Sequence, residues 1–324
     1  MRKLITSVGC IFIGVVFAID MTQLPVAKVT LHVVGENGGN LSGAKAEITF
    51  LNPVHKPGTW GSSDTFSRSG KTDANGLFVA EEKAGFEVHY GASAPNYYRS
   101  LGRFDFKTEK AGKYLPWNPT FEVVLKKIIN PIPMYARRAQ VETPVSDQPV
   151  GFDLVESDWV APYGKGKLSD FIFTLQRRFD SRRNYESIVT LSFSNQGDGL
   201  HAVEAPAEYG SELKLPHTAP DTGYAPQKVC RIGAAPGRSN YEDVQTSRNY
   251  LFRVRTIFDE RGQPASGLYG KIDGDIRLDS INSKTCILLF TYYLNPTPND
   301  RNLEFDPKRN LSTNLKDEER VTAP

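Results

Sequence analysis

The stretch that most constrains the fold is residues 70–78, GKTDANGLF, where turn chemistry meets the start of an apolar run. The Asp73 side chain can bond to the backbone just ahead of it, and Asn75-Gly76 tolerates positive φ. Residues 77–79 then begin a short apolar run. This pattern is typical of a strand, a tight turn and a second strand, so we expect a β-hairpin here.

A second pattern of the same kind lies upstream, with a predicted strand at 29–34, a glycine-rich turn and a strand entry at 43–50. In order, the chain shows a strand, a turn, a G-A-x-A/V entry, a long loop and a G-x-T-D-x-x-G-x-F hairpin. Over residues 25–127 this order resembles the carboxypeptidase regulatory-like domains. The resemblance implies a small Greek-key β-sandwich of transthyretin type, an accessory module without catalytic residues and hence with no site to transfer.

The N-terminus is typical of an export signal. Arg2-Lys3 precedes an apolar core at 10–17, and we predict cleavage after Ala18. The mature protein is then periplasmic, secreted or on the cell surface. The alternative of a lipid anchor at Cys10 is disfavoured because the apolar run before it is short. No apolar run approaches the roughly 20 residues of a membrane span, so no transmembrane segment is expected in the mature chain.

Composition narrows the function class. The chain has 39 basic and 37 acidic residues, a net charge of +2, so the total predicts neither a polyanion-binding surface nor a nucleic-acid partner. Aromatic residues make up 11% of the chain, and 14 of them are Tyr, which favours strands over helices. Short alternating segments recur throughout, and no helical period of useful length is present.

We therefore predict an all-β fold with two consecutive β-sandwich domains, the first of prealbumin-like Greek-key type and the second antiparallel and β-rich. The expected order is a signal peptide at 1–18, a sandwich at 19–127, a proline-containing linker at 128–150, a β-rich domain at 151–306 and a polar, disordered tail at 307–324. In the second domain, 250–258, 268–278 and 285–294 should form an antiparallel meander. Alternation along its first strand predicts Arg253 and Arg255 on a solvent-facing stripe.

Two cysteines remain after the signal peptide, Cys230 and Cys286, both in strand-like runs. In an oxidising compartment they are a candidate disulfide. Such a bond would close a loop of 286 − 230 = 56 residues and stabilise the fold by about 4 kcal/mol. The alternative is two buried thiols that pack as small hydrophobic side chains.

Motifs for nucleophilic, phosphate-binding or dinucleotide chemistry are absent from the sequence. His201, Glu204 and His217 fall in one long loop region, where a metal site is conceivable, but scattered surface residues explain them better. Carboxylates cluster near Asp153 and Asp273, and turn caps or solvated strand faces account for them. No cofactor and no metal are therefore expected.

Aromatic side chains in loops offer the better functional signal, because they can stack on sugars or anchor a protein partner. The alternative is that each packs against its own sandwich. The candidate binding residues are Trp60, Tyr97, Tyr98 and Trp117 in the first domain, and Trp159 and Tyr163 in the second.

The leading hypothesis is a secreted, non-catalytic binding or scaffold protein whose partner is a glycan or an extracellular or envelope protein. The long loop region 195–247 is the expected ligand surface. An arginine cluster at 177–183 predicts a solvated face, with contact to an anionic surface polymer or lipid as the alternative. The rival hypothesis is a hydrolase of polysaccharide or peptide that uses carboxylates of the second domain. A purely structural role in an envelope assembly is a third.

Overall fold

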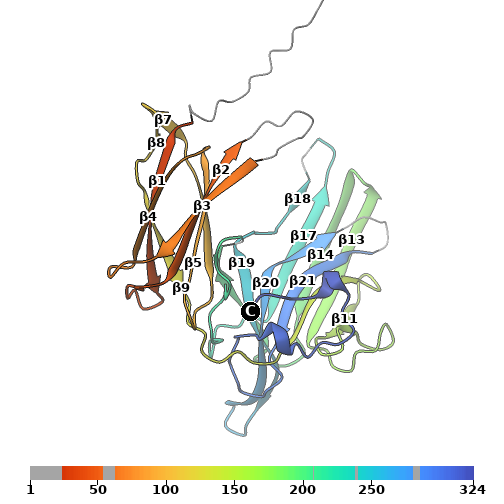
Figure 1. Cartoon of the computed structure of the whole chain (residues 1–324). Helices are drawn as coiled ribbons and strands as arrows, with labels where there is room; N and C mark the ends of the chain where they lie inside the picture. The colour runs from red at the N-terminus through yellow and green to blue at the C-terminus, as the bar shows by residue number, and fades with distance from the viewer. Residues whose placement is uncertain (1–23, 54–62, 207, 238–239, 280–284) are drawn as a thin grey trace, which may run out of the picture. The chain divides into compact units, whose positions relative to one another are not determined.

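The computed structural model describes residues 24–53, 63–206, 208–237, 240–279 and 285–324 (Figure 1). The predicted signal peptide and Trp60 lie outside them. Within these ranges, regular structure is β-strand apart from two 3-10 turns at Pro307–Arg309 and Asp317–Glu319. The predicted all-β fold is confirmed. The chain divides into two compact units, one of residues up to Ala92 together with Leu101–Val123, the other of Ser93–Ser100 and Val124–Pro324.

The first unit is built from two sheets. One contains, in spatial order, β4 (Leu77–Lys83), β1 (Val26–Gly35), β8 (Lys113–Leu115) and β7 (Thr108–Lys110), with β9 (Thr120–Leu125) also paired to β1. The other contains β6 (Ser100–Asp105), β5 (Glu87–Ser93), β2 (Lys45–Pro53) and β3 (Ser63–Lys71). Alternate residues are fully buried along β1 and β2, among them Val29, Leu31, Ile48 and Phe50. A sandwich is thus present where one was predicted, while membership of the carboxypeptidase regulatory-like group stays a prediction.

The turn in 70–78 has the predicted chemistry but joins different strands. The Asp73 carboxylate accepts hydrogen bonds from the backbone N–H groups of Asn75 at 2.9 Å and Leu77 at 2.8 Å. However, β3 pairs with β2, whereas β4 pairs with β1. The expected hairpin is therefore wrong, and the turn is a corner between sheets. Turn chemistry fixes only the local change of direction, since pairing depends on distant strands.

Gly76 in this corner and Gly43 in an earlier turn have the same backbone conformation but different surroundings, so their substitution distinguishes backbone strain from steric contact. Gly76 and Gly43 both have φ of +75°, but a Cβ on Gly76 would lie 2.6 Å from the Val33 carbonyl oxygen, whereas nothing lies within 4 Å of one on Gly43. We expect Gly43→Ala to lower the free energy of unfolding by about 1 kcal/mol, and Gly76→Ala by roughly 2 to 4 kcal/mol. Urea denaturation measures both, and equal losses would contradict the close contact.

The second unit is also a sandwich of two sheets. One contains β10 (Tyr135–Glu142), β21 (Ile287–Leu294), β20 (Pro264–Asp279), β19 (Arg248–Phe258) and β15 (Gly199–Glu204). The other contains β12 (Asp158–Trp159), β11 (Pro149–Asp153), β13 (Phe171–Ser181), β14 (Asn184–Ser192), β17 (Gln227–Ala234) and β18 (Tyr241–Glu242). A short strand, β16 (Gly210–Ser211), completes the unit. The predicted meander is confirmed, because β19, β20 and β21 pair in order and antiparallel.

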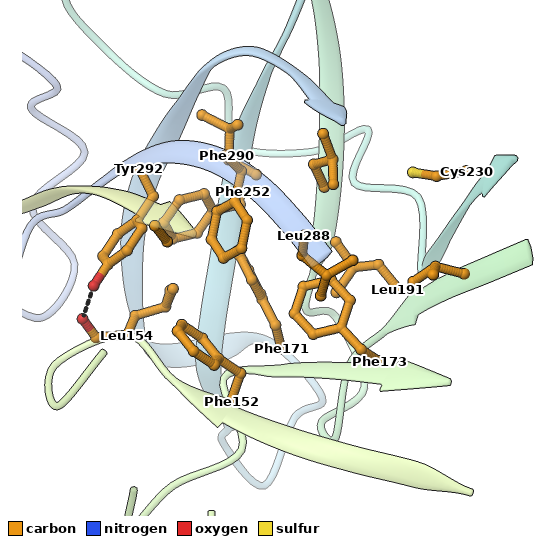
Figure 2. Close-up of a cluster of buried hydrophobic side chains, with 14 of the residues drawn as sticks. Phe152, Leu154, Phe171, Phe173, Leu191, Cys230, Phe252, Leu288, Phe290 and Tyr292 are labelled. Atoms are coloured by element: carbon orange, nitrogen blue, oxygen red, sulfur yellow. Dashed lines mark hydrogen bonds between the residues drawn. The ribbon is translucent and has the colours of Figure 1, made fainter. Parts of the chain in front are cut away.

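Aromatic side chains from both sheets fill the space between them (Figure 2). Phe171 lies edge-on to Phe252 with ring centroids 5.3 Å apart, and Phe152 to Phe290 at 5.8 Å. The buried Tyr292 hydroxyl donates to the Leu154 carbonyl oxygen at 2.7 Å, across the same interface. Each such ring pair adds about 0.5 to 1.5 kcal/mol beyond area burial. This core fixes the position of the meander strands.

The predicted linker and tail are both part of the second unit. β10 occupies the middle of the supposed linker and pairs with β21 along its whole length. Val321, from the supposed disordered tail, is 6% exposed and packs with Met134 and Phe305. The Asn310 side chain bonds both backbone groups of Ala136, at 3.1 and 2.9 Å. These two expectations are wrong because a few well-placed side chains anchor segments whose average composition is polar or proline-rich.

The arginines of β19 do not form a solvent-facing stripe. Pairing with β20 slips between Val254 and Ile257, and Arg255 in this bulge has a φ of 57°. The Asp198 carboxylate holds the bulge by accepting the backbone N–H of Arg255 at 3.0 Å. Arg253 is only 7% exposed and lies 4.8 Å from the Tyr224 ring centroid. The bulge breaks the alternation on which the expectation rested.

The predicted disulfide between Cys230 and Cys286 is not formed in the structure, where both residues are buried thiols. Cys230 lies on β17 opposite Val189, whereas Cys286 precedes β21 and its backbone N–H donates to Thr143 Oγ1 at 3.1 Å. The two therefore enter the core from different sheets. Burial raises the pKa of the Cys230 thiol to about 11, which is typical of a packed and unreactive side chain.

Candidate functional site

Two of the candidate aromatic residues are structural. Tyr98 is 7% exposed, and its hydroxyl donates to the Glu304 carboxylate at 2.8 Å. Trp159 is 6% exposed, and its indole N–H donates to the Glu142 carbonyl oxygen at 2.9 Å. Both polar atoms have internal partners, so these two side chains belong to the packing of the second unit.

The other described candidates are divided between the two units. Trp117 is 36% exposed in the first unit, with the Lys113 ammonium 4.6 Å from its ring centroid. Tyr97 is half-buried, and Tyr163 is 40% exposed in the loop after β12. Tyr97 and Tyr163 belong to the second unit and Trp117 to the first, so no single unit contains all three rings.

The three residues considered as metal ligands, His201, Glu204 and His217, each contact a different partner. His201 hydrogen-bonds the Gly223 carbonyl oxygen at 3.1 Å, and Glu204 accepts from the Ser247 hydroxyl at 2.5 Å. His217 instead lies 3.6 Å from the Glu304 carboxylate. Across the residues that the structure describes, no group of three or more His, Cys, Asp or Glu side chains is arranged to hold a metal ion.

The acidic residues near Asp153 organise a loop. The Asp153 carboxylate accepts backbone N–H groups of Val155 and Glu156 at 2.9 and 3.2 Å, and of Lys167 and Leu168 at 2.9 and 3.0 Å. Although burial opposes ionisation, these hydrogen bonds hold the pKa of Asp153 below its ordinary value. The Asp153 carboxylate therefore has a structural role, which is to accept the backbone hydrogen bonds of this loop.

The second unit contains a groove of about 800 Å³ on the outward side of the sheet formed by β10, β21 and β20. Segment 242–246 and the turn at 316–319 contribute walls. The floor of the groove is formed by Arg138, Gln140, Leu289, Thr291, Asp273 and Arg277. Its walls include Lys214, Glu242, Gln245, Thr246, Lys316, Glu318 and Glu319.

Strand register explains why these floor residues lie together. Arg138 is opposite Thr291, which is opposite Asp273 on the next strand. Two residues further along, Gln140 is opposite Leu289, which is opposite Arg277. Side chains alternate between the faces of a sheet, and the intervening Phe290 belongs to the core. The groove floor is therefore the uncovered part of the sheet's second face.

A buried carboxylate fixes one wall to the floor. Asp275 is 7% exposed and accepts the Tyr250 hydroxyl at 2.9 Å and the Gln245 backbone N–H at 3.2 Å. The Lys228 ammonium lies 3.1 Å from the same carboxylate. Burial, together with this carboxylate, raises the pKa of Tyr250 to about 12. Asp275 is thus a positioning residue for the wall around Gln245.

Only part of this groove was predictable from the sequence. Region 195–247, predicted as a long loop, contains the strands β15 to β18. It supplies Lys214 and the wall at 242–246, as expected for a ligand surface. The floor comes from β10, β20 and β21, and another wall from the supposed tail. Outward-facing arginines at Arg138 and Arg277 were the available signal, but their proximity depends on the strand order, which alternation along one strand does not reveal.

No known protein family and no characterised protein matches this sequence, and no described helix is long and apolar enough to cross a membrane. Solved structures with some similarity include wild-type catechol 1,2 dioxygenase of Acinetobacter radioresistens, at 16% identity over 33% of this chain and 53% of that one, with a TM-score of 0.24. A streptococcal ancillary pilin shares 12% identity over 81% of this chain and 58% of that one, with a TM-score of 0.23.

A shaft pilin of Lactobacillus rhamnosus GG shares 10% identity over 81% of this chain and 92% of its own, with a TM-score of 0.24. The match spans about half the length of the dioxygenase. Values this low assign neither a family nor a function. The identity of this chain therefore rests on its own architecture, that of an all-β protein of two sandwich units.

Proposed function

We propose that this protein is an exported, non-catalytic binding module, and that the groove of its second unit holds the ligand, a glycan or an extracellular protein. One observation carries the proposal: a groove of about 800 Å³ whose floor presents guanidinium groups at Arg138 and Arg277. Neither arginine forms an ion pair with any residue in the described ranges. Charged groups without an internal partner in a concavity are typical of a recognition surface.

The non-catalytic part of the proposal is supported by how the carboxylates are used. Asp153 is saturated by backbone N–H groups, Asp273 is paired with Lys214 at 2.7 Å, and Asp275 is bonded to Tyr250. A glycosidase needs two carboxyl groups facing each other across the scissile bond. Asp273 and Asp275 in the groove are instead engaged in holding the fold, which favours binding as the function.

The test uses the mature chain on a glycan array and in pull-downs of extracellular or envelope fractions. Thr291→Trp fills the middle of the groove floor from a half-buried strand position. Thr190→Trp is the matched control, since Thr190 is half-buried on β14 in the other sheet. We expect Thr291→Trp to abolish ligand binding and Thr190→Trp to leave it unchanged. A protein that retains no ligand, or binds one equally well in both variants, would refute the proposal.

A further inference from the structure

We infer that the groove binds a polyanionic glycan, a polysaccharide bearing carboxylate groups, and that Arg138 and Arg277 are its specificity-determining contacts. This inference deepens the proposed function and rests on it. The chain's net charge of +2 gives no hint of such a site, because the signal is local: it appears only when each charged group of the groove is matched with its partner.

Most of the acidic groups in the groove are already neutralised. Asp273 is paired with Lys214 at 2.7 Å, and Asp275 lies 3.1 Å from Lys228. Glu319 is paired with Arg137 at 2.6 Å, and although burial opposes ionisation, hydrogen bonds from Arg137 and the Lys316 backbone hold the pKa of Glu319 below its ordinary value. These three carboxylates therefore offer little attraction to a cationic ligand.

The charged groups on the groove floor that have no described ion-pair partner are both cations. Arg138 and Arg277 are both exposed, and within the described ranges neither has a carboxylate partner. Glu242 and Glu318, which form no ion pair with another described residue, lie on the walls, where Lys316 adds a further positive charge. An occupant in contact with the floor therefore meets two guanidinium groups, which favour oxyanions that they can bind in a bidentate manner.

The spacing of the arginines favours an extended chain over a single small anion. Arg138 is on β10 and Arg277 on β20, with β21 between them, so their backbones are separated by about two inter-strand spacings, roughly 10 Å. They are also offset along the strands, because Arg138 is opposite Thr291 and Arg277 is opposite Leu289, two residues away on β21. Acidic groups repeated along a polymer can engage both arginines at once, and the two contacts then reinforce each other.

The uncharged lining distinguishes a glycan from an acidic peptide. Gln140, Gln245, Thr246 and Thr291 present amide and hydroxyl groups to the groove. Sugar hydroxyls can pair with these groups and also donate to the wall carboxylates Glu242 and Glu318. A polyacidic peptide would bring its own carboxylates next to those two acids without hydroxyls to offset the repulsion. A carboxylate-bearing polysaccharide is therefore the occupant that uses all of the lining.

The experiment compares polygalacturonate with its fully methyl-esterified form, which keeps the sugar backbone and removes the charges. Binding of the mature protein is measured by calorimetry at 50 mM and 500 mM salt. We expect polygalacturonate to bind at least tenfold more tightly than the ester, and binding to weaken at the higher salt. Arg138→Gln and Arg277→Gln should each lower the affinity by roughly tenfold or more, as expected for a charge-assisted hydrogen bond.

The matched controls are Arg178→Gln and Arg231→Gln, two exposed arginines of the other sheet, one of them in the cluster at 177–183. They should leave the affinity unchanged. Equal binding of acid and ester, no binding of polygalacturonate, or loss of binding in these controls would overturn the inference. So would polyglutamate binding as tightly and with the same dependence on both groove arginines.

The experiments distinguish a failure of the inferred charge preference from a failure of the proposed function. If Thr291→Trp abolishes binding of a neutral glycan or a protein that Arg138→Gln and Arg277→Gln do not affect, the groove is a binding site and only its charge preference is wrong. If Thr291→Trp affects no ligand of any class, the proposed function itself is wrong.

Discussion

Replacing Arg255 with alanine should lower the free energy of unfolding of the second unit by about 3 to 5 kcal/mol. The Arg255 guanidinium bonds both oxygens of Asp170, at 2.7 and 2.8 Å, and lies 3.6 Å from the Asp153 carboxylate. The two acidic side chains are 0% and 3% exposed. Without the arginine, two carboxylates would remain buried without a counter-charge, and that cost exceeds the value of the ion pair itself.

The position of this cluster adds to the effect. Arg255 is on β19, whereas Asp153 is on β11 and Asp170 immediately precedes β13, so the ion pairs connect the two sheets of the sandwich. A loss of this size is a large part of the roughly 5 to 15 kcal/mol by which domains are stable. Opening of the sheets at this end is the expected first step of unfolding.

Urea denaturation at neutral pH, monitored by tryptophan fluorescence, measures the loss. Arg231→Ala is a suitable control, because Arg231 is exposed on β17. Asp170→Asn combined with Arg255→Ala removes one of the two unpaired charges and should recover part of the stability. If Arg255→Ala and the control lose the same stability within about 0.5 kcal/mol, the ion pairs of Arg255 do not stabilise the contact between the two sheets.

Replacing Lys271 with methionine should stabilise the second unit, by on the order of 4 kcal/mol below neutral pH. Lys271 is 1% exposed, and its ammonium donates to the Leu303 carbonyl oxygen at 2.6 Å and lies 4.6 Å from the Tyr293 ring centroid. No ion pair of this residue occurs within the described part of the chain. Burial therefore lowers the pKa of Lys271 to about 7.

The sign of the pH dependence follows from this shift. In the unfolded chain the lysine has a pKa near 10.5, so the unfolded state holds a proton that the folded state has lost between about pH 7 and 10.5. Wild-type stability should rise with pH across this window. The cost of the buried charge is complete below pH 7 and disappears above about pH 10.5. Lys271→Met removes the titrating group and should remove this rise.

Denaturation curves at pH 6, 8 and 10 measure the difference between the wild type and Lys271→Met. The advantage of the variant should be greatest at pH 6 and shrink steadily toward pH 10. Lys165→Met, at an exposed loop position, should show no such trend. A variant that is less stable than the wild type at pH 6 would mean that the ammonium is well solvated or paired in the folded state.

Much of the strand content could be predicted from local patterns. Alternating apolar residues predicted the meander, and the turn chemistry of Asp73 was confirmed by its hydrogen bonds to Asn75 and Leu77. These features succeed because a strand buried on one face repeats every two residues, and because an aspartate can satisfy the backbone of its own turn.

The errors share a physical cause, which is that they concern partners far away in the chain. From the sequence β10 was interpreted as a linker, because the strand that supplies its hydrogen bonds, β21, follows about 150 residues later. Arg255 looked solvent-exposed until the bulge held by Asp198 turned it toward Asp170. Neither the register slip nor the buried acids can be read from alternation along one strand.

The sequence by itself determined an all-β protein, its main strands and the local chemistry of its turns, since backbone preferences and the two-residue period are local properties. The tertiary structure alone decided which side chains meet. It buried Tyr98 and Trp159 in internal hydrogen bonds and brought Arg138 and Arg277 onto one groove floor. The reason is that strand order and register, which place residues on a shared surface, are selected by the burial of the whole sheet.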